Sequence, residues 1–131
     1  MIVGVGLDLV DIARVKRLIA SKETRALERL FTAGEVRYAM SKVEPYVHLA
    51  ARIAAKEAGY KALSGSPGAR GIGWREMEVV SVDSGLPELL LHGAAEARCA
   101  ELRVERVWLT LSHSKMTAGA VVVLEGLGTR E

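Results

Sequence analysis

The sequence predicts an α+β fold, in which a first strand leads into several helices and two hairpins follow with one helix between them. Two pairs of strand-length apolar runs are separated by short turns, and one long helical pattern is rich in alanine. With one Phe, three Tyr and two Trp, the core must be largely aliphatic, which favours close packing of helix on sheet. The length of 131 residues is that of a single domain, residues 1–131.

The N-terminal segment from Ile2 to Leu7 alternates glycine with apolar residues and is predicted to be a short buried strand that ends at Asp8. Its glycines leave room for another element to approach the backbone. Helical segments follow: a helix capped by Asp11 that runs to about Ala20, a second over residues 23–31, and a third that starts at a capping box of Thr32 and Glu35 and carries Val36, Tyr38 and Met40.

A fourth, longer helix is predicted from Pro45, which suits a first helical turn, to Ser64, with Gly65 as its stop signal. Such a helix can lie close on a sheet because small residues recur along it every three or four positions. These residues are Val47, Ala50 or Ala51, Ala54, Ala58 and Ala62.

The second half of the chain begins with a glycine-rich loop from Ser64 to Gly73, which lacks the Walker pattern of a phosphate-binding loop. The elements predicted after it are strands over Trp74–Val82 and Leu86–Leu91 joined by Asp83, Ser84 and Gly85, a helix over Gly93–Leu102, strands over Arg106–His113 and Thr117–Glu125, and a frayed tail from Gly126 to Glu131.

The cysteine content and the length of the apolar runs indicate the cellular compartment of the protein. The longest apolar runs are of strand length, so no membrane span is predicted. The single Cys99 excludes a disulfide within the chain and is interpreted as a buried spectator thiol. Because the N-terminus also runs directly into a strand, the sequence predicts a cytoplasmic protein.

Positive charge concentrates in the first forty residues, although the formal net charge is only +2. The residues concerned are Arg14, Lys16, Arg17, Lys22, Arg25, Arg29 and Arg37. They form either a solvated helical face or a docking surface for an acidic partner, since a patch of one sign orients oppositely charged molecules. Nucleic acid is not expected, because the segment has no interleaved aromatic residues and no nucleic-acid-binding motif.

Asp8, at the end of the first strand, and Glu57, on the alanine-rich helix, form a candidate cation site. Two neighbouring carboxylates favour a cation between them, and without clustered Cys or His that cation would be Mg²⁺. In the alternative interpretation, Asp8 caps the turn and Glu57 pairs with Lys61 one helical turn later. Arg52, Lys56, Glu57 and Lys61 fit a solvated salt-bridge face equally well.

Ser112 and His113 end a hydrophobic strand at a tight turn. Adjacent strand residues point to opposite faces, so these two cannot act together as nucleophile and base. The sequence also lacks a G-x-S-x-G elbow. A serine hydrolase is therefore not expected.

Five motifs cover nearly the whole chain. They are Val5–Val15 (VGLDLVDIARV), Phe31–Glu35 (FTAGE), Arg52–Ala58 (RIAAKEA) with Lys61 and Ala62, Gly85–Pro87 (GLP), and Leu111–Ser114 (LSHS). In this order they resemble the G-(I/L)-D signature, the F-(S/T)-x-x-E segment, the R-(F/W)-A-A-K-E-A helix, the G-x-P turn and the S-(I/L)-S-H strand end of small acyl-carrier-protein synthases. These enzymes belong to the 4′-phosphopantetheinyl transferase superfamily. Mild departures from the family pattern occur at Ile53, Leu86 and Ser114.

The resemblance implies an enzyme that moves the 4′-phosphopantetheine arm of coenzyme A to a serine of an acidic apo acyl carrier protein, as in fatty acid biosynthesis. Adenosine 3′,5′-bisphosphate would leave. By resemblance, Asp8 and Glu57 hold Mg²⁺ against the coenzyme's pyrophosphate and Lys61 stabilises the developing charge. Either Glu57 or a metal-bound water would take the serine proton.

The resemblance also implies ligand and partner contacts. Coenzyme A would contact Arg52, Pro87, Ser112 and His113, with His113 near the nucleotide phosphate, although Ser112 and His113 also fit a purely structural strand end. The carrier protein would dock on Arg14, Arg17 and Arg25. Family members of this length assemble as homotrimers with active sites between subunits.

Two other function classes were compared with this expectation. A basic adaptor for an acidic protein would keep Arg14 but would not need Asp8, Glu57 and Lys61 together. A magnesium-dependent nucleotide hydrolase would need a phosphate loop and a water-positioning residue, and the sequence contains neither.

Overall fold

Helices and antiparallel sheets combine in an α+β fold, as predicted. The structure is a computed structural model that describes residues 1–64, 71–81 and 85–128, without the side chains of residues 22–24. A three-stranded sheet has the order β1 (Ile2–Asp11), β5 (Thr117–Gly126), β4 (Val104–His113), and a second sheet pairs β2 (Met77–Ser81) with β3 (Pro87–Leu91). The helices are α1 (Ile12–Leu30), α2 (Ala33–Met40), α3 (Pro45–Leu63) and α4 (Gly93–Glu101), with a 3₁₀ turn, η2, at Trp74–Glu76.

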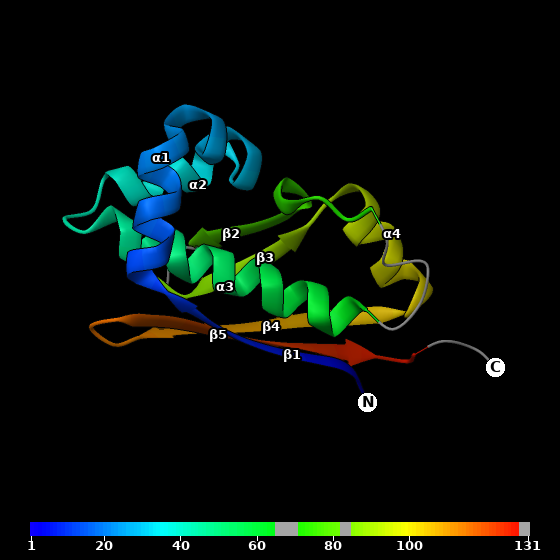
Figure 1. Ribbon diagram of the computed structural model, residues 1–131. Helices are drawn as coiled ribbons and strands as arrows, with labels where there is room; N and C mark the ends of the chain where they lie inside the picture. The colour runs from blue at the N-terminus through cyan, green and yellow to red at the C-terminus, as the bar shows by residue number, and fades with distance from the viewer. Residues whose placement is uncertain (65–70, 82–84, 129–131) are drawn as a thin grey trace.

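Helix α3 is the centre of the fold. Figure 1 shows it running along one face of the three-stranded sheet, with α1 and α2 towards one end and α4 at the other. The alanines of its predicted stripe are buried, whereas Val47 is only partly buried. A Cβ atom built on Gly6 of β1 would overlap the backbone carbonyl of Ala58. The glycines of β1 are therefore required by the close approach of α3, and this contact fixes how α3 lies relative to β1.

Strand β1 is longer than predicted. It does not end at Asp8, because β5 offers backbone partners as far as Thr117, which lies opposite Asp11. Asp11 then caps α1, as predicted, with Oδ1 accepting from the backbone N–H groups of Ala13 at 2.9 Å and Arg14 at 3.4 Å.

The two helical segments predicted before residue 32 are one continuous helix, α1. No glycine or proline interrupts the sequence between Ala20 and residue 23. Val15, Ile19 and Ala26 are all buried in this helix, so its apolar face is continuous across the expected break.

The capping box at the start of α2 is confirmed. The backbone N–H of Thr32 donates to Glu35 Oε1 at 2.9 Å, and the backbone N–H of Glu35 donates to Thr32 Oγ1 at 3.2 Å. Helix α3 begins at Pro45, as predicted, and its last helical residue is Leu63.

Both predicted hairpins are present, but the first begins later than expected. Residues 74–76 form η2 instead of strand, because the Glu76 carboxylate accepts the backbone N–H of Gly73 at 2.7 Å and closes a tight turn. The glycine-rich loop predicted over residues 64–73, the turn at Asp83 and Ser84, and the end of the tail lie wholly or partly outside the described residues.

The face of the three-stranded sheet that points away from α3 carries large apolar side chains. Val5, Leu7 and Leu9 of β1 are 57%, 57% and 68% exposed, and Trp108 of β4 is 50% exposed. They share this face because strand residues alternate and β5 keeps β1 and β4 in register. We refer to these four residues as the outer apolar face. Among the described residues, no helix combines the length and apolarity that crossing a bilayer requires.

Candidate active site

The contact between β1 and α3 brings Asp8 and Lys61 together. Lys61 Nζ donates to Asp8 Oδ1 at 3.0 Å and to the backbone carbonyl of Leu7 at 3.1 Å. Glu57 lies one helical turn before Lys61 and is partly buried. The interpretation in which Lys61 pairs with Glu57 is therefore wrong for Lys61, which reaches across to β1 instead. Nor does Asp8 cap a turn, since it lies within the strand.

The solvated salt-bridge face considered for α3 is wrong for Arg52 and Lys56. Their exposed fractions are 3% and 0%. Lys56 Nζ donates to Glu35 Oε1 at 2.7 Å and to the backbone carbonyls of Trp74 at 2.8 Å and Met77 at 2.5 Å. Burial lowers the pKa of Lys56, and the adjacent Glu35 carboxylate opposes that shift.

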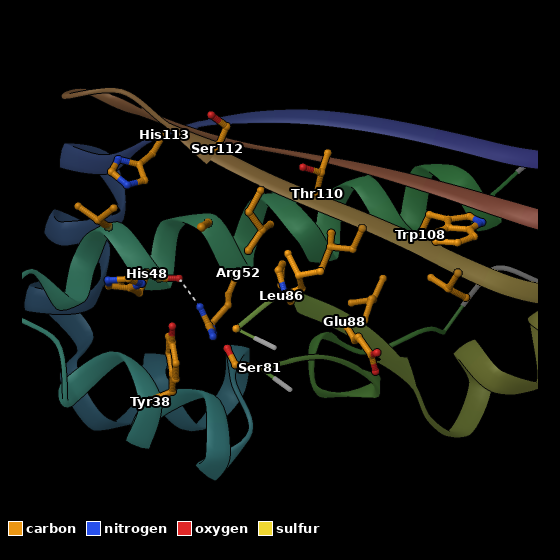
Figure 2. A pocket seen from close by; sticks show the side chains of 18 of the residues that line it. Tyr38, His48, Arg52, Ser81, Leu86, Glu88, Trp108, Thr110, Ser112 and His113 are labelled. Carbon is orange, nitrogen blue, oxygen red and sulfur yellow. Dashed lines mark hydrogen bonds between the residues drawn. The ribbon is translucent and has the colours of Figure 1, made fainter. Parts of the chain in front are cut away.

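A cavity of about 740 Å³ lies between α2, α3, β3 and β4. All four residues that the resemblance assigned to coenzyme A, namely Arg52, Pro87, Ser112 and His113, contribute to its lining. They come from three different elements, so the sequence alone does not bring them together. The structure thus gathers the predicted ligand-binding residues around one space, seen from close by in Figure 2.

Arg52 is the best-defined polar group of this cavity. Its guanidinium lies 4.3 Å from the ring centroid of Tyr38, and its Nη1 donates to the backbone carbonyl of His48 at 3.3 Å. In the described part of the chain, its Nε is the one buried side-chain nitrogen or oxygen without a hydrogen-bond partner. Burial lowers the pKa of this guanidinium. A buried cation with an unused N–H donor suits an anionic ligand.

Ser112 and His113 point to opposite faces of β4, as expected for adjacent strand residues (Figure 2). The ring of His113 lies on the side of the strand that faces α3, whereas the Ser112 hydroxyl points away from α3. Only His113 is therefore oriented to contact a ligand held between β4 and α3 within this chain.

Tyr38 and His48 are among the lining residues that sequence reasoning missed. His48 precedes Arg52 by four positions, so helical spacing could have assigned both to one face of α3. Tyr38 lies on α2 and carried no comparable signal. A hydrogen bond from Ser81 lowers the pKa of Tyr38, although burial acts in the opposite direction.

The three arginines predicted to meet a carrier protein, Arg14, Arg17 and Arg25, are all exposed on α1. The same helix buries Val15 and Ile19 against the rest of the fold. Since Asp11 both ends β1 and caps α1, the cationic surface begins close along the chain to Asp8.

Asp8 and Glu57 are the residues of this site that could hold a metal ion. No group of three or more Asp, Glu, His or Cys side chains suited to a metal occurs among the described residues. Two carboxylates supply hard oxygen donors and leave most coordination positions to water and phosphate oxygens, which is the arrangement that Mg²⁺ favours. The donor types therefore fit Mg²⁺.

Comparison with known proteins places the chain in a family. Residues 4–120 match the family model of the 4′-phosphopantetheinyl transferase superfamily. Over 125 residues the chain is 44% identical to the holo-[acyl-carrier-protein] synthase of Geobacter sulfurreducens, covering 95% of this chain and 98% of that protein. It is 42% identical over 125 residues to the same enzyme of Geotalea daltonii, covering 95% and 99%.

Solved structures agree with this placement. The holo-[acyl-carrier-protein] synthase of Neisseria meningitidis superposes with a TM-score of 0.83 at 30% identity, covering 95% of this chain and 99% of that one. The Bacillus anthracis enzyme, in complex with CoA (3′,5′-ADP), gives 0.77 at 31% identity, covering 97% and 99%. The chain therefore belongs to the 4′-phosphopantetheinyl transferase superfamily, and within it to the holo-[acyl-carrier-protein] synthases.

Proposed function

We propose that the protein transfers the 4′-phosphopantetheine arm of coenzyme A to a serine of an apo acyl carrier protein, giving the holo carrier and adenosine 3′,5′-bisphosphate. The observation that carries the proposal is the cavity lined by both the buried Arg52 and the exposed His113, within a chain that belongs to this enzyme family. A coenzyme with several phosphate groups needs such cationic donors.

In the proposed reaction, the serine oxygen attacks the phosphorus that carries pantetheine, and the bond to the departing nucleotide oxygen breaks. Asp8 and Glu57 would hold Mg²⁺, which when bound supplies neutralisation of the pyrophosphate charge. We assign to Glu57 the role of accepting the serine proton. Lys61, whose side chain is 52% exposed, can turn from Asp8 towards the transferring phosphate.

Recognition of the carrier is assigned to Arg14, Arg17 and Arg25 on α1. All three are exposed, and α1 begins four residues after the strand position of Asp8. Charge complementarity acts mainly on encounter and orientation, so this surface would bring an acidic carrier to the site without holding it tightly. The proposed substrate is the carrier protein of fatty acid synthesis in the cytoplasm, where Cys99 would stay reduced.

We further propose that the protein is a homotrimer and that the outer apolar face lies between its subunits. Contiguous exposed apolar side chains on a sheet favour association. Light scattering of the purified chain should give three times the mass of one chain. The Leu7→Lys variant should lower that mass, because an ammonium group would enter the interface; an unchanged mass in this variant would place the interface elsewhere.

Mass spectrometry tests the transfer itself. An apo carrier protein incubated with the enzyme, coenzyme A and Mg²⁺ should gain the mass of one phosphopantetheine, about 340 daltons for the group transferred in this phosphoryl-transfer reaction. A chelator should abolish the gain, and restored Mg²⁺ should return it. Carrier binding without any gain in mass would indicate the basic adaptor instead, and release of a nucleotide without carrier modification would indicate a hydrolase.

A further inference from the structure

We propose that His48 is a specificity-determining residue of the cavity, which joins Arg52 and His113 in contacting a nucleotide phosphate and strengthens that contact when it is protonated. The inference rests on the proposed function, because it takes coenzyme A as the nucleotide. We assign the contact to the 3′-phosphate of coenzyme A.

Geometry places the three side chains together. His48 and Arg52 occupy positions i and i+4 of α3, and His113 ends β4; all three line the same cavity. Figure 2 shows His48 and His113 at the same end of the cavity, one on the helix and one on the strand, with Arg52 next to His48. An anion between α3 and β4 at this end would therefore meet groups from both elements.

The imidazole of His48 is held in place by its neighbours. It meets the ring of Tyr38 edge to face, with centroids 5.7 Å apart and an interplanar angle of 79°. Its backbone carbonyl accepts the hydrogen bond from Arg52 Nη1 at 3.3 Å. The Arg52 guanidinium also lies over the Tyr38 ring, so both side chains pack against the same residue.

Arg52 provides an independent indication of a ligand. The residue is 3% exposed, and its Nε has no hydrogen-bond partner among the described residues. Buried guanidinium nitrogens are normally satisfied, because an unmade hydrogen bond to a charged group is costly. A phosphate oxygen is a suitable acceptor for this nitrogen.

The charges around His48 explain why it would respond to a phosphate. Burial lowers the pKa of His48, and Arg52, Lys42 and His113 lower it further, whereas Glu44 alone raises it. Tyr38 is the remaining titratable group that packs against the ring. A phosphate dianion would counter the positive charge of Arg52 and Lys42, so His48 would take up a proton as the ligand binds.

The test measures binding, not turnover. Calorimetry would give the affinities of coenzyme A and of dephospho-coenzyme A, which lacks the 3′-phosphate, between pH 5.5 and 8 for the wild type, His48→Phe and His48→Gln. Phe keeps an aromatic ring against Tyr38, and Gln keeps a polar side chain, but neither takes up a proton. His92→Gln is the matched control, because His92 lies outside this cavity and pairs with Glu78.

The preference for coenzyme A is the ratio of its affinity to that of the dephospho form. On acidification from pH 8 to 5.5, this ratio should rise about three- to tenfold more in the wild type than in either His48 variant. Such a factor corresponds to a change of at most about one unit in the pKa of His48 when the phosphate binds. The phosphate's own ionisation, near pH 6, cancels when variants are compared at one pH. Proton uptake on binding, measured in buffers of different ionisation enthalpy, should be smaller in both variants.

Three results would overturn the inference, and they separate it from the proposed function. If both His48 variants keep the wild-type preference and proton uptake at every pH, His48 does not contact the phosphate, and the proposed transfer activity is unaffected. If the wild type binds neither nucleotide, the assignment of the cavity to coenzyme A fails, and the proposed function fails with it. Equal changes in His92→Gln would show that the pH effect does not belong to the cavity.

Discussion

The substitution Lys56→Met should destabilise the fold strongly, because it removes one partner of a fully buried ion pair. The ammonium makes three hydrogen bonds, to Glu35 and to the carbonyls of Trp74 and Met77, and so ties α3 to α2 and to the start of β2. Methionine has a similar length and fills the space without strain, but it donates no hydrogen bond. The Glu35 carboxylate, 1% exposed, would stay buried without its cation.

The expected cost is about 3–5 kcal/mol, the usual result when one member of a buried pair is removed. This is a large part of the total stability of a domain, about 5–15 kcal/mol. Glu35 would retain backbone N–H donors from Thr32 at 2.9 Å and Val79 at 2.9 Å, which keeps the cost within that range. The double variant Lys56→Met/Glu35→Gln has no unpaired buried charge. It should therefore lose less unfolding free energy than the sum of the losses in the two single variants.

Urea unfolding followed by circular dichroism would measure all of these free energies. Lys61→Met is the control, because the Lys61 side chain that pairs with Asp8 is 52% exposed and such pairs contribute about 1 kcal/mol or less. A loss below about 1 kcal/mol for Lys56→Met, or strictly additive losses in the double variant, would refute this account of the buried pair.

Three further outcomes are expected. Asp8→Ala should abolish transfer in the mass assay while changing the free energy of unfolding by about 1 kcal/mol or less, because the Lys61 side chain that pairs with it is 52% exposed. Near-normal transfer would remove Asp8 from the proposed metal site. Arg14→Glu should raise the carrier concentration needed for half-maximal rate far more than the coenzyme A concentration needed for it. This effect should shrink as salt rises, because charges are screened within about 8 Å at physiological ionic strength. Equal effects on both substrates would contradict docking on α1. Gly6→Ala should lower the free energy of unfolding by about 1–3 kcal/mol or more, because the new Cβ would overlap the backbone of α3. Gly34→Ala is the control, because a Cβ there meets only ordinary contacts. Equal urea midpoints for the two variants would show that α3 can shift.

Local signals predicted most of the elements correctly, because their causes are local. Thr32 and Glu35 form the capping box that their spacing indicates, Asp11 caps the next helix, and Pro45 begins α3. The extent of β1 was not predictable in this way. It depends on how far β5 continues as a partner, which is a property of a strand more than one hundred residues later in the chain.

The site was only partly predictable for a similar reason. Helical spacing favoured a pair between Glu57 and Lys61, yet Lys61 instead reaches Asp8, because Gly6 allows α3 to approach β1 so closely. Charge suggested that Lys56 was solvated. Its burial depends on carbonyls from η2 and β2, whose positions no pattern within α3 reports.

The alternation of side chains along β1 has a consequence for sequence change. Gly6 and Asp8 face α3, whereas Val5, Leu7 and Leu9 belong to the outer apolar face. Deleting a single residue between Asp8 and α1, with α1 held in place, would exchange the two sets, turning a leucine against the helix and the carboxylate away from it. Point substitutions can therefore alter one face and spare the other, whereas a deletion next to α1 would disturb both faces at once.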